Sequence, residues 1–169
     1  MDINMISLIV ATVALLIALG TFYFYTADRK RSANKSDDGF SARPLQLQAY
    51  ERLVMLAERI ALPNLVSRVN QSGMSPKEMQ LLLLESIKQE YEYNATQQIY
   101  VSPVAWEAIK NLKDQNMLII NQVASAMGGE GTGTDLNRRL LDFVMTQKKG
   151  ALHTIVLEAL NYEAKKLMK

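Results

Sequence analysis

The stretch PLQLQAYERLVMLAERIALP, residues 44–63, decides the fold class because its apolar side chains recur at helical spacing. Such a period predicts an amphipathic helix whose apolar stripe packs against other elements. Pro44 suits the first turn of this helix, and Pro63 predicts its end because the residue before a proline avoids the α region. The predicted stripe consists of Leu45, Ala49, Leu53, Leu56 and Ile60.

Further helices follow along the chain. Ser75 and Ser102 each precede a proline and are expected to cap helices that begin at the next residue. Between these helices, the segment QQIYVS (residues 97–102) predicts an extended linker or a short lone strand, since it is β-branched and aromatic. The predicted fold class is all-α, with a compact helical domain of about five helices over residues 44–169.

The N-terminal segment differs in character from the rest. Residues 3–27 carry no charged side chain, and they end near an aromatic run from Phe22 to Tyr25. About 20 apolar residues suffice to cross a bilayer as a helix. A cleaved signal peptide would carry positive charge before the run, where only Asp2 stands, and a buried core helix is the other alternative. We therefore expect an uncleaved transmembrane anchor over residues 3–27.

The charges that flank this anchor predict its orientation. Four basic residues follow the apolar run, and no lysine or arginine precedes it. The positive-inside rule then places the N-terminus outside and the rest of the chain in the cytoplasm, at a bacterial inner membrane. Residues 28–43 lack apolar periodicity and are expected to form a flexible tether. The basic residues that set the topology, and that are expected to face lipid headgroups, are Arg29, Lys30, Arg31 and Lys35.

The glycine-rich stretch MGGEGTGTDLNRR, residues 127–139, raises the question of a phosphate-binding loop. A Walker loop needs lysine and then serine or threonine after its last glycine, and it must follow a strand. Here Thr134 and Asp135 follow Gly133, and the preceding segment is predicted to be helical. We expect a flexible connection between helices, with Thr134 as the next cap and with little constraint on the glycines.

No other constellation indicates catalysis or a cofactor. The chain has no cysteine and a single histidine, His153, so thiolate sites and metal motifs that need two histidines are excluded. The Glu-x-x-His pairs of di-iron bundles are missing, because Gly150 stands three residues before His153. We expect no catalytic, cofactor-binding or metal residue. Asn116 falls on an apolar stripe, where a buried amide usually fixes register, and any functional role of Asn116 or His153 stays open.

Aromatic residues cluster near the middle of the chain. Tyr93, Tyr100 and Trp106 form a candidate interaction patch. The alternative is that Trp106 anchors the core and the tyrosines lie at its edge.

The segments GMS (residues 73–75) and QQIYVS, with the tryptophan that follows, resemble an uncharacterised family of small single-pass membrane proteins from Bacteroidota. The resemblance covers about residues 48–124 and the anchor layout. It implies no activity, cofactor or site residue.

The sequence thus favours a non-catalytic, membrane-tethered interaction or scaffold module whose partner is another membrane or cytoplasmic protein. An alternative is a domain that binds an anionic ligand, either lipid headgroups or nucleic acid. Its candidate residues would be Arg138, Arg139, Lys148 and Lys149. A net charge of +2 is too small to indicate nucleic acid, so none is expected. An enzyme of unrecognised design is a third option, and self-association is left open.

Overall fold

The computed structural model describes residue 21, residues 41–146 and residues 152–169. The chain divides into two compact units, residues 1–41 and residues 42–169. The predicted anchor (3–27) and most of the predicted tether (28–43) lie outside the described residues, as do the four basic residues of the topology signal. None of the described helices combines the length and the apolar character needed to cross a bilayer.

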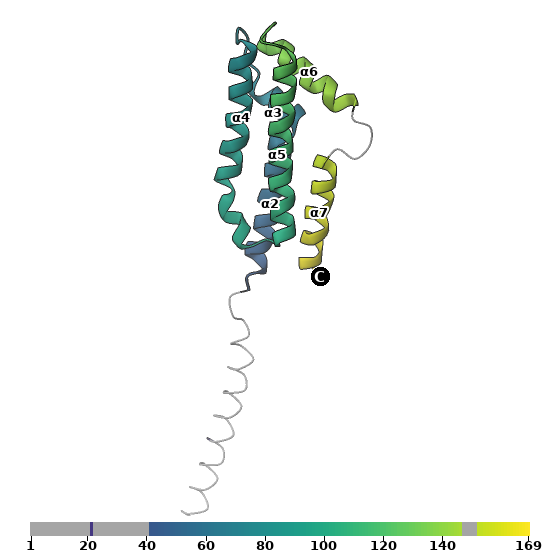
Figure 1. Cartoon of the computed structure of the whole chain (residues 1–169). Coiled ribbons are helices and arrows are strands. Elements are labelled where there is room, and N and C mark those ends of the chain that lie inside the picture. The colour runs from purple at the N-terminus through teal and green to yellow at the C-terminus, as the bar shows by residue number, and fades with distance from the viewer. Residues whose placement is uncertain (1–20, 22–40, 147–151) are drawn as a thin grey trace, which may run out of the picture. The chain divides into compact units, whose positions relative to one another are not determined.

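The described part of the chain is all-α, which confirms the predicted fold class (Figure 1). Six α-helices and one 3-10 helix (η1) are present in this part, one more α-helix than the approximate number predicted. Their bounds are α2 Arg43–Ile60, α3 Leu62–Val69, α4 Pro76–Tyr93, η1 Ala95–Ile99, α5 Pro103–Ala126, α6 Gly133–Thr146 and α7 Leu152–Leu167.

The long helices α2, α4, α5 and α7 run alongside one another, and α6 packs on α3, α4 and α5 near the start of α4 (Figure 1). Four of the five residues of the predicted α2 stripe are fully buried, and Leu45 is half-buried. Burial of this kind is the main favourable term in folding. The largest fully buried side chains are Leu53, Leu56, Ile60, Leu65, Met79, Leu83, Ile87, Ile109, Leu112, Ile120, Leu136 and Leu140.

Both predicted serine caps are confirmed. The Ser75 side chain accepts the backbone N–H of Glu78, and the Glu78 carboxylate accepts the N–H of Ser75, which completes a capping box. The Ser102 hydroxyl accepts the N–H of Ala105 at 3.0 Å. These contacts satisfy backbone donors that have no partner within the helix, so the starts of α4 and α5 follow from local sequence.

The structure corrects the interpretation of QQIYVS. Its first residues lie in η1 rather than in an extended linker or strand. The backbone satisfies itself here, because Gln97 N–H donates to the Asn94 carbonyl and Tyr100 N–H donates to the Gln97 carbonyl, both at 3.0 Å. The prediction relied on the β-branched composition of this segment. A single strand has no neighbouring strand to pair with, so the backbone hydrogen bonds are formed within a 3-10 turn instead.

The start of α6 also differs from the prediction. Thr132, rather than Thr134, is the capping residue: its hydroxyl accepts the N–H of Asp135 at 3.2 Å, and the Asp135 carboxylate accepts the N–H of Thr132 at 3.0 Å. Gly133 is the first helical residue, and its N–H donates to the Met74 carbonyl at 2.8 Å. This contact ties the loop to the start of α4, so the expected freedom of the glycines is wrong at this position.

Asn116 has a clear structural partner. Its side-chain amide donates to the carbonyl of Ile60, the last residue of α2, at 2.8 Å, and Asn116 is 7% exposed. The α2 helix ends there because Pro63 follows within the first turn of α3. A buried carbonyl without a donor is costly, so Asn116 stabilises the end of α2 and fixes the register of α5 against it.

Candidate interaction surface

An uncharged turn joins α4 to α5 at one end of the bundle. No charged residue occurs from Tyr93 to Trp106, and η1 within this stretch has no buried residue. Beyond Tyr93, three apolar or aromatic side chains of this stretch project into solvent: Ile99 is 73% exposed, Val104 70% and Tyr100 36%. We call Ile99, Tyr100 and Val104 the η1 surface. Exposed apolar residues that gather in one patch mark surfaces that bind partners or membranes, and these three lie within six residues of the chain.

The three aromatic residues of the predicted patch have different surroundings. Trp106 is half-buried against the core, and its ring centroid lies 5.2 Å from that of Tyr91, at an interplanar angle of 31°. The ammonium group of Lys113 lies 4.7 Å from the centroid of the Tyr91 ring. Trp106 therefore packs within the α4–α5 contact. Tyr100 belongs to the η1 surface, whereas Tyr93 is 74% exposed and lies beside Arg52 of α2.

Tyr93 stands at a cleft of about 480 Å³ between α2 and α4. The guanidinium of Arg52 lies 5.9 Å from the centroid of the Tyr93 ring, which is within range of a cation–π contact. Met55, exposed on α2, adds an apolar side chain. The full lining is Arg52, Met55, Leu56, Arg59, Gln89, Glu90, Tyr93 and Asn94, and we call this cavity the α2–α4 cleft.

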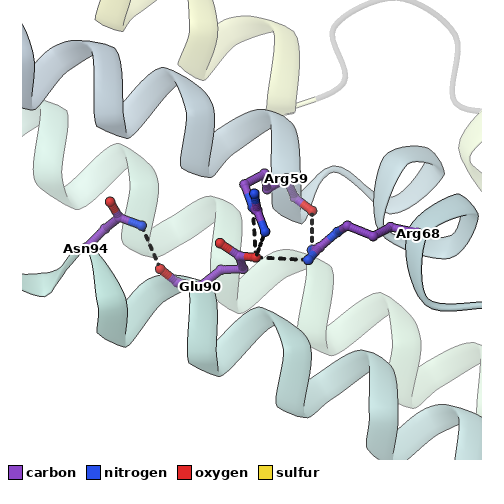
Figure 2. A network of polar contacts seen from close by, with 4 residues as sticks. All are labelled: Arg59, Arg68, Glu90 and Asn94. Carbon is purple, nitrogen blue, oxygen red and sulfur yellow. Dashed lines mark hydrogen bonds and ion pairs between the residues drawn. The ribbon is translucent and has the colours of Figure 1, made fainter.

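A charged network forms part of this cleft (Figure 2). One carboxylate oxygen of Glu90 accepts from Arg59 Nε at 2.8 Å and lies 2.7 Å from Arg59 Nη2. The same oxygen accepts from Arg68 Nη1 at 2.9 Å, and Arg68 also donates to the Arg59 carbonyl at 3.2 Å. The Asn94 side chain donates to the Glu90 carbonyl at 2.9 Å. The network thus joins α2, α3 and α4 through one carboxylate that is only 14% exposed.

The charges at the cleft do not balance. Arg59 and Arg68 share the single carboxylate of Glu90, and Arg52 contacts an aromatic ring. Guanidinium groups stay protonated at all ordinary pH values, so an excess of positive charge remains around the cleft. The combination of exposed Met55, exposed Tyr93 and excess arginine suits a ligand that is partly apolar and carries an acidic group.

A second polar cluster fixes α7 to the bundle. The hydroxyls of Tyr50 and Ser102 both donate to the Glu163 carboxylate, at 2.5 and 2.6 Å, and the Ser102 N–H donates to the Tyr50 oxygen at 3.2 Å. Burial raises the pKa of the Tyr50 hydroxyl, and its hydrogen bond to Glu163 raises it further. Ser102 also caps α5 through Ala105, so its hydroxyl is fully engaged in structural contacts. We call this set of three residues the α7 clamp.

The glycine-rich loop does not present an anion site. The Asp135 carboxylate stands at the start of α6, where a phosphate would bind, and accepts from the N–H and hydroxyl of Thr132. These hydrogen bonds lower the pKa of Asp135, so the carboxylate keeps its negative charge there. Arg138 lies 3.7 Å from the same carboxylate, and Lys148 and Lys149 lie outside the described residues.

His153 borders another cleft, of about 490 Å³, among α2, α3, α5, α6 and α7. Its Nε2 atom is buried and lies 3.5 Å from a carboxylate oxygen of Glu58, which is too far for a good hydrogen bond. In the described ranges, no group of three or more histidine, aspartate or glutamate side chains could hold a metal ion. This cleft therefore offers two titratable groups, Glu58 and His153, and a mainly apolar wall.

Sequence reasoning missed the residues that give these surfaces their character. Ile99 and Val104 could have been found from the uncharged stretch between Tyr93 and Trp106, because helical turns at a surface normally carry charge. Arg52 and Glu90 had no local signal, since their partners lie on other helices.

A protein-family model described as Family of unknown function (DUF7935) matches residues 1–167. No curated protein and no solved structure matches the chain. The family match spans the segment before the helical domain as well as the domain itself, and it brings no activity to either.

Proposed function

The chain belongs to this family of unknown function, and we propose that it is a non-catalytic interaction module tethered to a bacterial inner membrane. In this proposal residues 3–27 anchor the chain and residues 28–43 connect the anchor to the helical domain in the cytoplasm. The flanking charges of the apolar run support the orientation. The resemblance to small single-pass proteins of Bacteroidota agrees with this location.

The α2–α4 cleft is the observation that carries the proposal. It combines exposed Met55 and Tyr93 with excess arginine, and this mixture is typical of the residues that dominate protein–protein contacts. We propose that it receives an acidic segment of a protein partner. The polar clusters at Glu163 and Thr132 are instead used to hold helices in place, which leaves them little freedom for chemistry.

Binding of an anionic ligand through Arg138, Arg139, Lys148 and Lys149 has less support. Arg138 lies near Asp135, whose carboxylate opposes an anion, and the two lysines are not described. An enzyme of unrecognised design has the least support, because Ser102 and Glu163, a hydroxyl and a carboxylate that line one cleft together, are engaged in capping α5 and holding α7. The cleft of His153 is lined by that imidazole and by the Glu58 carboxylate, but by no hydroxyl.

The topology can be tested with a reporter fused after Lys169. We expect alkaline phosphatase fused there to be inactive and green fluorescent protein to be fluorescent, because Arg29, Lys30, Arg31 and Lys35 hold their side of the anchor in the cytoplasm. Replacing these four residues by glutamine should weaken that preference. Phosphatase activity of the unmodified fusion would place the domain outside the cytoplasm and reject the proposal.

Partner binding at the α2–α4 cleft can be tested by photo-crosslinking in cells. We expect the full chain with Tyr93→p-benzoylphenylalanine to form a discrete crosslinked species, because position 93 lies at the cleft. The change Arg52→Glu should reduce this species by roughly tenfold, since one charge-assisted contact contributes about 1.5 kcal/mol.

The matched control is Leu118→p-benzoylphenylalanine. Leu118 is also an exposed apolar residue, but it lies on α5 and does not line the cleft. Crosslinking at position 118 should be absent or should not respond to Arg52→Glu. Equal crosslinking from both positions, or no effect of the arginine change, would mean that the cleft is not the binding surface.

A further inference from the structure

The η1 surface and the end of α7 lie at the same end of the helical domain. The α7 clamp holds Glu163 against Ser102, which lies between Tyr100 and Val104 in the chain. The clamp also joins them to Tyr50, in the second turn of α2. Figure 1 shows α2 beginning at the end where α4 passes into η1 and where α7 ends. Residue 42, where the helical domain begins, therefore lies at this end.

We propose that this end of the domain docks onto an anionic membrane surface, with the η1 surface inserted among the headgroups and the end of α7 above them. The proposal rests on the proposed function, because it requires the anchor to hold the domain near the bilayer. It extends that function by giving the domain a second contact, with lipid, that is separate from the α2–α4 cleft.

The apolar part of the contact comes from the uncharged stretch. Ile99 and Val104 are among the most exposed apolar residues of the described chain, and Tyr100 lies between them in the sequence. Tyrosine suits the headgroup region, because its ring is apolar and its hydroxyl stays hydrated. Tyr162 on α7 and Met168 directly after it are also exposed. Such side chains enter the interface without burying a charge.

The charged part comes from the last turn of α7 and the two residues that follow it. Lys165, Lys166 and Lys169 are exposed, and the ammonium group of Lys166 lies 4.3 Å from the centroid of the Tyr162 ring. The nearby carboxylate of Glu163 accepts two hydrogen bonds inside the clamp, so it does not project with the lysines. Glu107, just beyond the uncharged stretch, lies 3.5 Å from Lys110. Positive charge therefore dominates the end of α7, as an anionic surface requires.

The tether of the proposed function, residues 28–43, makes the contact geometrically feasible. A flexible chain of about 15 residues has a root-mean-square span of roughly 20 Å. Such a tether would keep the end of the domain where α2 begins within a short distance of the anchor and would raise its local concentration at the bilayer. Weak apolar and ionic contacts then suffice to hold the domain in one orientation.

The absence of cysteine permits a direct test on the full chain. The variant Ile99→Cys, labelled with an environment-sensitive fluorophore, is reconstituted in vesicles of phosphatidylcholine with or without phosphatidylglycerol. A spin-labelled lipid serves as the quencher. We expect strong quenching that requires phosphatidylglycerol and is largely lost in 1 M salt, where the Debye length falls to about 3 Å. The same label on Ser125→Cys, an exposed position at the opposite end of α5, should be quenched little.

Replacing Lys165, Lys166 and Lys169 together by glutamine should reduce the ratio of docked to undocked protein by roughly a hundredfold, at about fivefold per basic residue near the surface. Extraction with alkaline carbonate separates this test from that of the proposed function. Release of the wild-type chain by carbonate would reject the membrane tether itself. A chain that stays in the membrane but shows equal quenching at positions 99 and 125, or no need for anionic lipid, would overturn the docking proposal alone.

Discussion

Replacing Gly133 by alanine should lower the free energy of unfolding by about 2–4 kcal/mol, because overpacking costs about 1–3 kcal/mol and a displaced hydrogen bond adds about 0.5–1.5. A Cβ atom at this position would stand 2.9 Å from the Cβ of Met79 and 3.1 Å from the carbonyl oxygen of Met74. Neither neighbour can move easily, since Met79 is fully buried and the Met74 carbonyl accepts the N–H of Gly133 at 2.8 Å. The decrease in the free energy of unfolding can be measured by urea denaturation of the full chain in mild detergent, with the fluorescence of Trp106 as the signal.

The control variants lie in the same loop. Thr134 is exposed, so Thr134→Ala should change the stability little, whereas Thr132→Ala should cost about 1 kcal/mol through loss of the cap. By intrinsic propensity alone, Gly133→Ala would stabilise the start of a helix. A stability of Gly133→Ala equal to or above that of the wild type would therefore show that α6 does not approach α4 as closely as the structure indicates.

The contrast between the serine caps and Gly133 shows what the sequence could predict. Ser75 and Ser102 were found because a cap and its helix lie within four residues of each other, so the signal is contained in one window. The role of Gly133 depends on Met74 and Met79, which lie more than fifty residues earlier in the chain. From the sequence alone, a glycine in a loop indicates flexibility. In the structure, Gly133 instead permits the close packing of two helices.

The candidate surfaces show the same difference between signals contained in a short stretch of sequence and contacts between distant segments. The sequence indicated Tyr93, Tyr100 and Trp106 together, because they are close in the chain. Two residues of helix turn a side chain by about 200°, so Tyr91 meets Trp106 while Tyr93 faces Arg52. The network at Glu90 had no sequence signal, since its arginines lie 31 and 22 residues away. Contacts between helices of this kind depend on how the helices pack and not on local pattern.

Replacing Glu163 by alanine should have an effect of similar size, about 2–4 kcal/mol. Each hydrogen bond to a charged group contributes about 1.5–3 kcal/mol, and partial exposure of Glu163 reduces the sum. The change would leave the hydroxyls of Tyr50 and Ser102 without their shared acceptor, and Tyr50 is only 4% exposed. We expect denaturation at lower urea concentration and faster hydrogen exchange along α7. Glu158→Ala, at an exposed position of the same helix, is the matched control and should have little effect.

The pH dependence of stability provides an independent test of the same clamp. The pKa of Tyr50 is raised in the folded chain, whereas a tyrosine in the unfolded chain has the ordinary pKa of 10.0. Folding therefore favours the neutral form of Tyr50. The corresponding stability is fully present below pH 10 and is lost as the pH rises through the raised value. We expect the wild type to lose stability above pH 10 more steeply than Tyr50→Phe, which keeps the ring but has no proton to lose. Identical alkaline profiles would mean that the hydroxyl of Tyr50 does not hold α7, because a clamp made through that proton must fail when the proton is removed.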